Sequence, residues 1–171
     1  LKTDFRSLVP SGARMRMLGN LPYNISTPLL FHLLQQAEAI HDMHFMLQKE
    51  VVQRMAAKPG GKEYGRLTIM LAVHCRVEPL FNIGAGAFSP PPKVESAFVR
   101  LIPHAAPPFP IDDPVRFARL VTQAFSHRRK TLRNALRESV EETLIRAAGI
   151  DPGTRPETVS PADYARLSNL A

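Results

Sequence analysis

Three residues that could act on a nucleobase stand close together in the stretch GNLPYNISTP, residues 19–28. The Asn20 side chain supplies a hydrogen-bond acceptor on a short arm, and Pro22 withholds an amide donor while leaving main-chain carbonyls as further acceptors. Tyr23 offers a flat face on which a base can stack. Two acceptors and a stacking face are what an exocyclic amine of a purine needs. Because the acceptors take both amine hydrogens, they draw the nitrogen toward a tetrahedral geometry that can attack a methyl group.

The position of this stretch bears on whether it is a site or a turn. It follows the segment 14–18, whose pattern predicts a strand, and it precedes an apolar helical segment. Open α/β sheets bind their ligands at the carboxyl ends of strands, which favours a site. The alternative is a strand-to-helix turn in which Asn20 and Pro22 serve only local geometry. These residues alone leave both interpretations open.

Strand and helix patterns alternate around this stretch. Ser26, Thr27 and Pro28 predict a helix start, with a capping hydroxyl and a proline in the first turn. We expect strands at 14–18, 43–47, 77–83 and 95–102 and helices at 29–36, 49–57 and 66–75. The order β-α-β-α-α-β-β predicts an α/β fold, with half of an α/β sheet and an antiparallel edge.

A change of composition after Leu101 predicts a second domain. The Pro-rich segment 104–110 is typical of a linker. Beyond it we expect helices at 114–125, 128–138 and 140–147, and a last short helix that Ser160 opens. We therefore predict two domains, residues 1–105 and 106–171, of which the second is all-α.

Basic charge dominates the chain and is concentrated in the second predicted domain. The net charge of +7 and the sequence pI near 10.1 indicate affinity for a polyanion, with nucleic acid the leading candidate. Residues 115–137 contain seven cations and no carboxylate, namely Arg116, Arg119, Arg128, Arg129, Lys130, Arg133 and Arg137. At helical spacing Arg129, Arg133 and Arg137 would share one face. The alternative is a solvated basic face without a ligand.

Other composition features exclude several classes of protein. The single cysteine, Cys75, cannot form an internal disulfide, so we expect a cytoplasmic protein. We expect Cys75 to be a helical residue whose side chain is buried in the protein core. The six histidines lack paired-ligand spacing, so we predict no metal site. No apolar run approaches the ~20 residues of a membrane span, and the first residues do not resemble a signal peptide.

Three ordered motifs resemble one known family. The stretch GNLPYNISTPLLFHLL, residues 19–34, resembles the catalytic motif of the adenine-N6 dimethyltransferases of small-subunit ribosomal RNA. FSPPPKVES at 88–96 is similar to the second substrate loop of that family, and FSHRRKTLRN at 125–134 to the basic helix of its C-terminal domain. The resemblance implies the C-terminal part of a Rossmann-like S-adenosylmethionine-dependent methyltransferase domain, followed by a small all-α RNA-binding domain.

The resemblance also implies roles for individual residues. Asn20 would accept from the adenine amine, helped by the backbone carbonyl of Leu21 or Pro22, and would lie against S-adenosylmethionine. Tyr23 and Phe88 would stack on the two faces of an extruded adenine. The implied partner is small-subunit ribosomal RNA or its precursor particle. We expect a monomer that takes part in ribosome biogenesis and does not bind a membrane.

One family feature is missing from the sequence. The family's Gly-rich cofactor loop has no counterpart, because Gly84-Ala85-Gly86 is followed by prolines rather than by a helix. Leu1–Phe5 resembles the stretch after the family's third acidic motif, so we expect the chain to begin midway through the methyltransferase domain and to be inactive alone. Three alternatives remain open: a large-subunit RNA methyltransferase of the macrolide-resistance type, a non-catalytic RNA-binding or assembly module, and, less well supported, a helix-turn-helix DNA-binding protein.

Overall fold

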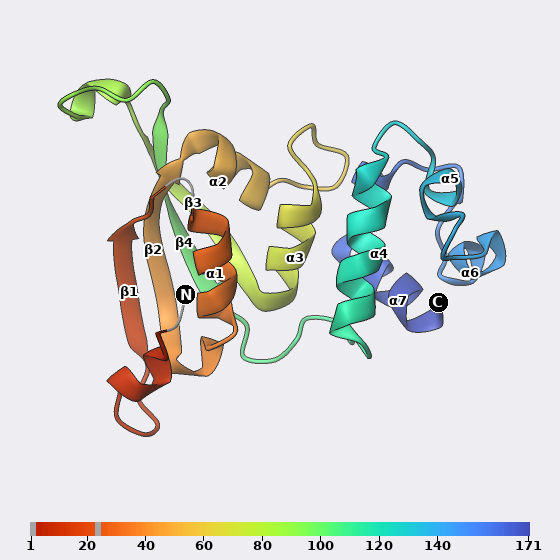
Figure 1. The fold of residues 1–171 in the computed structure, drawn as a ribbon, viewed down its shortest axis with the longest axis horizontal. Helices are drawn as coiled ribbons and strands as arrows, with labels where there is room; N and C mark the ends of the chain where they lie inside the picture. The colour runs from red at the N-terminus through yellow and green to blue at the C-terminus, as the bar shows by residue number, and fades with distance from the viewer. Residues whose placement is uncertain (1–2, 23–24) are drawn as a thin grey trace. The chain divides into compact units, whose positions relative to one another are not determined.

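The structure is a computed structural model that describes residues 3–22 and 25–171 (Figure 1). The strands are β1 (Met15–Asn20), β2 (Ile40–Gln48), β3 (Cys75–Ile83) and β4 (Ser96–Pro103). The helices are α1 (Ser26–Leu34), α2 (Lys49–Met55), α3 (Arg66–His74), α4 (Pro114–Ser126), α5 (Leu132–Leu136), α6 (Glu142–Ala147) and α7 (Pro161–Leu170). The order of strands and helices agrees with the order predicted from the sequence.

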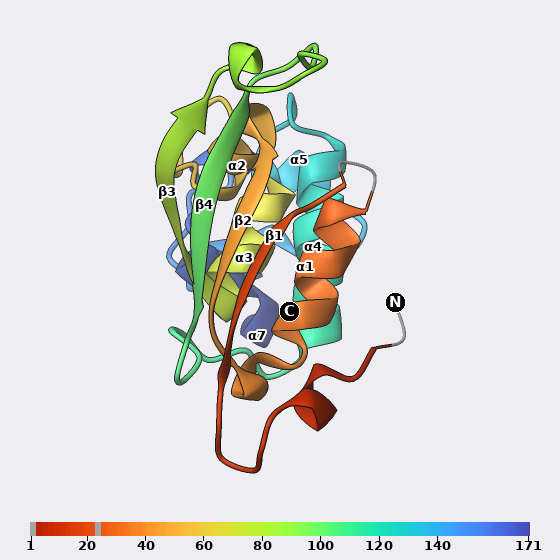
Figure 2. The ribbon, with the colours of Figure 1, turned by 90° about the vertical axis from the view of Figure 1, so that its left-hand side faces the viewer.

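The strands form one mixed sheet in the order β1-β2-β4-β3. β1 and β2 run parallel, as expected for strands joined by the crossover helix α1, whereas β4 pairs antiparallel with both β2 and β3. The predicted α/β fold with an antiparallel edge is therefore confirmed for this sheet. Figure 2 shows the four strands side by side and twisted.

Residues 1–56 and 74–105 make up the first of two compact units, which holds the whole sheet. The side chains of β2 and β4 alternate in burial, and Phe45 and Val99 on the inner face are 2% and 0% exposed. Leu30, Leu33 and Leu34 of α1 are spaced to share one helix face and are also buried. These side chains form the core of the first unit.

The second unit contains residues 106–171 and also 57–73. Its core holds Phe117, Leu120 and Val121 of α4 together with Tyr64 and Ile69. Tyr64 is fully buried, and its hydroxyl donates to the Val159 carbonyl at 2.8 Å. The segment 57–73, predicted to belong to the first domain, thus packs with the helical unit because its apolar side chains complete that core. Whether the predicted limits are those of independently folding domains stays a prediction.

Two local predictions about the first unit are wrong. Cys75 is buried at 2% exposure, but it opens β3 rather than lying in a helix, and burial raises its pKa to about 12. The predicted capping hydroxyl at the start of α1 is also absent from the N-cap position, which Ile25 occupies without a side-chain cap. Ser26 is instead a buried residue of the first turn, with Pro28 following as predicted.

In the part of the chain that the structure describes, no helix is both long and apolar enough to cross a membrane.

Candidate active site and basic pocket

Asn20 is the last residue of β1, and its side chain is exposed. It pairs with Met46 in the parallel ladder, and the next amide, of Leu21, donates to the Met46 carbonyl at 3.2 Å. The Leu21 side chain is only 6% exposed. Pairing and burial on the carboxyl side therefore fix the backbone at Asn20 while the amide group of its side chain stays accessible.

The chain turns directly after this point. The Pro22 carbonyl accepts from the Ile25 amide at 3.2 Å, which leads the backbone into α1. A carbonyl has two lone pairs, so this oxygen keeps capacity for one more donor. Tyr23 lies outside the described residues, and its stacking role stays a prediction.

The loop that carries Phe88 leaves the sheet at the same edge as Asn20. The parallel pairing of β1 with β2 brings Asn20 beside the carboxyl end of β2, and Gln48 at that end pairs with Ser96, where β4 begins. Ser96 also pairs with Ile83, where β3 ends. The loop 84–95 therefore starts and ends at this edge, as Figures 1 and 2 show.

Phe88 follows a short 3-10 helix, Ala85–Ala87, and is half-buried. The far end of its loop is fixed to α2, because the Lys49 amide donates to the Glu95 carbonyl at 2.9 Å and Lys49 Nζ lies 2.7 Å from Glu95 Oε2. The structure thus brings the two motif-bearing segments to one sheet edge. Direct stacking of Phe88 on a base stays a prediction.

A buried carboxylate ties together the strands that place Asn20. Asp42 of β2 is fully buried, and its oxygens accept from Arg16 Nε at 2.6 Å and from Arg100 Nη2 at 2.8 Å. The hydrogen bond from Arg16, with that from Arg100, lowers the pKa of Asp42 to about 2 although burial opposes the shift. Arg16 and Asn20 alternate onto the same face of β1. The charged network therefore fixes the register of three strands on the face where Asn20 is displayed.

The seven cations predicted to bind RNA do not form one helical surface. Arg116 and Arg119 lie on α4, but the predicted helix 128–138 is wrong, because α5 spans only Leu132–Leu136. The reason is that the amides of Leu132 and Arg133 donate to the carbonyls of Thr154 and Pro152, so a loop replaces the preceding turn of helix. Arg129 precedes α5 and Arg137 caps its end, so the predicted face shared by Arg129, Arg133 and Arg137 is wrong as well.

Several of these cations have partners inside the second unit. Arg116 Nη1 donates to the Ala171 carbonyl at 2.7 Å, and Arg128 Nη2 donates to the carbonyls of Lys62 and Tyr64 at 3.1 and 3.2 Å. Arg133 lies 3.8 Å from Glu142. Arg116 and Arg128 thus hold parts of the unit together, and an RNA contact by either stays a prediction.

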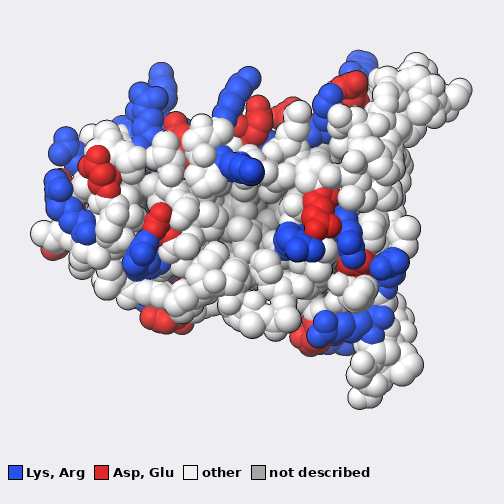
Figure 3. Space-filling view, turned by 180° about the vertical axis from the view of Figure 1, so that it is seen from behind, with Lys and Arg blue, Asp and Glu red and all other residues white. Residues whose placement is uncertain are grey.

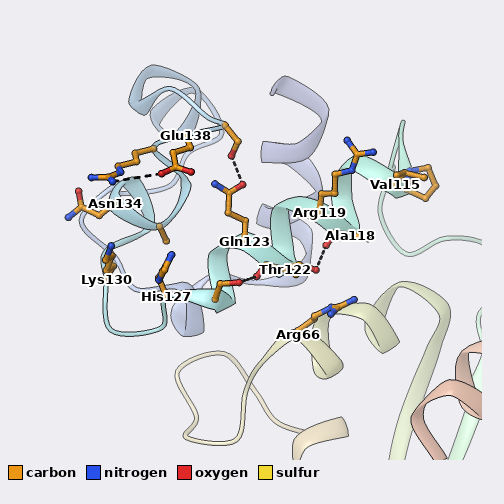
Figure 4. Close-up of a pocket in the computed structure, with 15 residues that line it drawn as sticks. Arg66, Val115, Ala118, Arg119, Thr122, Gln123, His127, Lys130, Asn134 and Glu138 are labelled. Atoms are coloured by element: carbon orange, nitrogen blue, oxygen red, sulfur yellow. Dashed lines mark hydrogen bonds and ion pairs between the residues drawn. The ribbon is translucent and has the colours of Figure 1, made fainter. Parts of the chain in front are cut away.

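Other cations converge on a pocket of about 940 Å³ in the second unit (Figure 4). Its cationic lining residues are Arg66, Arg119, Lys130 and Arg137, and they come from α3, α4 and the region of α5. Neutral polar side chains also line it, including Gln123, His127 and Asn134. Glu138 is the acidic side chain among the lining residues, 3.8 Å from Arg137.

Sequence reasoning missed three residues of this pocket, Arg66, Gln123 and Asn134. Arg66 lies in a segment predicted to belong to the other domain, and Gln123 lies outside every motif. Asn134 ends the motif 125–134, but that motif was interpreted through its cations. The one available signal was that Arg66 begins an apolar helix, whose buried face must pack against another element.

A sequence profile described as ribosomal RNA adenine dimethylase matches residues 1–171. The chain is 60% identical over 169 residues to the ribosomal RNA small subunit methyltransferase A of Pseudomonas aeruginosa. The aligned region covers 99% of this chain and 63% of that protein. It is 55% identical over 171 residues to the protein of the same name from Alcanivorax borkumensis, covering 100% of this chain and 61% of that protein. The chain therefore spans about three fifths of the length of these curated relatives.

Two solved structures have a similar fold. A dimethyladenosine transferase from Plasmodium falciparum superimposes with a TM-score of 0.75 at 26% identity, covering 89% of this chain and 64% of that one. The 23S rRNA methyltransferase ErmE has a TM-score of 0.72 at 23% identity, covering 99% and 70%, and this likeness concerns the fold alone. With the profile match over its whole length, the chain belongs to the ribosomal RNA adenine dimethylase family.

Proposed function

We propose that the intact protein transfers methyl groups from S-adenosylmethionine to the N6 amines of adenosines in small-subunit ribosomal RNA, and thereby acts in ribosome biogenesis. The observation that carries this proposal is the meeting of two motif segments at one sheet edge, where Asn20 ends β1 and the loop with Phe88 leaves β3. Relatives at 55–60% identity are named small subunit methyltransferases, which favours the small subunit over the large one.

The residues of this chain would act on the adenine amine. The Asn20 side-chain oxygen accepts one amine hydrogen, and the Leu21 or Pro22 carbonyl accepts the other. The nitrogen lone pair is then less delocalised into the ring and points at the methyl donor. Tyr23 and Phe88 hold the extruded base between their rings, at roughly 1–3 kcal/mol per stacked base.

One residue of this chain, Asn20, supports the assignment of S-adenosylmethionine as the cofactor. Asn20 is exposed at the carboxyl edge of parallel strands, which is where such sheets hold a nucleoside ligand, so it fits a contact with S-adenosylmethionine. That molecule would supply the electrophilic methyl group. Gly84–Gly86 does not fit a cradle for the methionine part of that molecule, because Gly84 caps and Gly86 lies within the 3-10 helix Ala85–Ala87, which a Pro-rich loop follows.

The two compact units would have different functions, methyl transfer and RNA binding. We infer that the sheet unit is the C-terminal part of a Rossmann-like methyltransferase domain and that the helices after residue 106 form a small RNA-binding domain. The alternating strands and crossover helix support the first assignment. The cations around α4 and α5 support the second.

The test is the substitution Asn20→Ala in the intact protein. We expect transfer of labelled methyl groups to small-subunit RNA to fall by about two to three orders of magnitude, because one of two acceptors at the reacting amine is lost. The fold should persist, since Asn20 is exposed and its backbone pairing does not depend on the side chain.

Asn82→Ala is the matched control for this test. Asn82 is also exposed and lies near the same sheet edge, on β3, but outside both motifs. Methyl transfer should stay near the unmodified rate in that variant. Near-normal transfer by Asn20→Ala would refute the assigned role of Asn20.

A further inference from the structure

We propose that the pocket of the second unit is a second nucleotide site, which binds an unstacked nucleotide of the RNA through its phosphates and base edge. This proposal rests on the proposed function and deepens it by naming where the substrate RNA is held apart from the adenine that is methylated. Figure 4 shows side chains of α3, α4 and the α5 region arranged around the pocket.

The charge of the pocket favours a polyanion. Four cations and one carboxylate line it, and the carboxylate, Glu138, lies 3.8 Å from Arg137. Within the described residues, Arg66, Arg119 and Lys130 have no acidic side chain at ion-pair distance. Asp113 lies near enough to Arg119 for that cation to help lower its pKa, but the two form no ion pair. Three like charges facing one hollow repel one another, and phosphate groups would remove that repulsion.

One face of the molecule shows how Lys, Arg, Asp and Glu side chains are distributed there. Figure 3 shows one face of the molecule, where Lys and Arg side chains project at several separate places with Asp and Glu between them. At the pocket, cations from three segments meet, and Glu138 is the one carboxylate among the described lining residues.

The neutral lining suits a base. The Gln123 side-chain oxygen accepts from Ser139 Oγ at 2.7 Å, which turns its amino group away from that bond (Figure 4). Asn134 adds a second amide, and amides present both a donor and an acceptor to a base edge. Ala118 and Ala135 supply apolar wall.

The hydroxyl groups of the pocket are less suited to phosphate. Thr122 Oγ1 donates to the Ala118 carbonyl at 2.6 Å, and Ser126 Oγ donates to the Thr122 carbonyl at 2.9 Å. Their hydrogens are therefore engaged by the helix, and the cations remain as the donors that can reach phosphate oxygens. This separates the phosphate contacts, made by charged groups, from the base contacts, made by amides.

The size of the pocket and its amide side chains favour single-stranded over duplex RNA. The volume of about 940 Å³ is at the upper end of pockets that enclose small ligands, so a nucleotide can enter if it is unstacked. Sequence-specific RNA recognition commonly uses such splayed-out bases. A duplex would leave the base edges paired and out of reach of Gln123 and Asn134.

The experiment measures binding of this chain to a labelled single-stranded RNA of about ten nucleotides over a range of salt concentrations. Each phosphate contact contributes about −0.7 to the slope of log affinity against log salt for a single strand. We expect Arg66→Gln to flatten the slope by about 0.7 and the double variant Arg66→Gln with Arg119→Gln by about 1.4. Arg66→Lys should keep the slope, because it keeps the charge.

Two matched variants separate this site from general attraction. Arg155→Gln removes the same charge from an exposed residue of the same unit outside the pocket, and the slope should not change. Asn134→Ala removes a neutral group, so it should weaken binding several-fold at every salt concentration and leave the slope unchanged. Thermal unfolding of each variant shows whether the unit is still folded, and both Arg66 and Arg119 are exposed.

An unchanged slope in the double variant, or an equal flattening in Arg155→Gln, would overturn the proposal. Stronger binding of a polyglutamate peptide than of the RNA would also overturn it, in favour of an acidic protein partner. These outcomes are independent of methyl transfer. If the Arg66 and Arg119 variants kept the salt slope of the unmodified chain while Asn20→Ala still abolished methyl transfer, only the pocket proposal would be refuted. If the slope flattened as expected but Asn20→Ala transferred methyl groups normally, only the proposed reaction would be refuted.

Discussion

The carboxylate of Asp42 contacts cations from two neighbouring strands while it is fully buried. A buried charge without partners would be expensive, and Arg16 and Arg100 supply the compensating hydrogen bonds. The two arginines are only partly buried, so solvent still screens part of the attraction. At the scale of single residues, this network and the exposed Asn20 share the outer face of the sheet. The Asp42 network holds the strands in register, and Asn20 is exposed at the end of one of them.

Asp42 should make the stability of the sheet unit depend on pH in acid. Its pKa falls from 3.8 in the unfolded chain to about 2 in the folded protein, so the unfolded state binds the proton first as pH decreases. The stabilisation is therefore complete above pH 3.8 and is lost as pH falls toward 2. In Asp42→Asn, the free energy of unfolding at neutral pH should drop by about 1–3 kcal/mol, and the dependence on pH in this window should weaken.

Urea unfolding followed by circular dichroism measures this effect, and hydrogen exchange of the β2 amides assigns it to the sheet. Asp112→Asn is the control, because Asp112 is an exposed carboxylate in the other unit. If Asp42→Asn kept the acid dependence of the unmodified chain, the network would not be the source of it.

At the scale of elements, the second unit depends on a segment that lies far from it in the sequence. The Gly60 amide donates to the Glu157 carbonyl at 2.7 Å, and the Tyr64 hydroxyl donates to the Val159 carbonyl at 2.8 Å. Arg128 adds bonds to two carbonyls of the same segment. These contacts place Arg66 at the basic pocket, since Arg66 begins the helix that follows Tyr64.

We predict that Tyr64→Phe loosens this segment. Removing the hydroxyl leaves the buried Val159 carbonyl without that donor, which should lower the free energy of unfolding by about 1 kcal/mol. Hydrogen exchange of amides in residues 57–65 should become faster than in the rest of the unit.

Tyr164→Phe serves as the comparison. Its hydroxyl is equally buried and donates to the Pro156 carbonyl at 2.9 Å, so the global loss should be similar. Exchange in residues 57–65 should not change selectively. Identical exchange patterns in the two variants would contradict the account of how this segment is attached.

At the scale of the whole molecule, two compact units carry different parts of the proposed chemistry. The sheet unit contains the edge with Asn20 and the loop with Phe88, and the helical unit contains the basic pocket. Neither contains a Gly-rich loop that joins a strand to the helix after it, because no glycine lies between β1 and α1 or between β2 and α2. In the proposed function, these two regions would contact the methyl acceptor, and Asn20 alone would also lie against the methyl donor.

We therefore expect the 171-residue chain to bind S-adenosylmethionine weakly or not at all. Backbone amides arranged by a Gly-rich loop are what such a nucleoside ligand needs, and Gly84–Gly86 does not provide them. Isothermal titration calorimetry of the chain and of the intact protein measures the difference. Micromolar affinity of the chain alone would show that its own residues suffice to hold the cofactor.

The sequence by itself determined the order of elements and the position of Asn20 at the end of a strand. Both follow from local patterns, because period-2 and period-3.6 spacing and turn residues act over a few neighbouring residues. The sequence also predicted the α/β fold, since a strand, a helix and a second strand in succession favour parallel pairing. The family resemblance was confirmed over the full length.

Tertiary structure decided what depends on residues far apart in the chain. Carbonyls of Thr154 and Pro152 take the amides that a longer α5 would need, so the expected basic helix face does not form. Burial against α4 and α7 assigns the segment 57–73 to the second unit, and so brings Arg66 to the pocket. The network around Asp42 joins three strands. None of these leaves a local pattern, because hydrogen bonds and burial between distant segments are fixed only when the chain has folded.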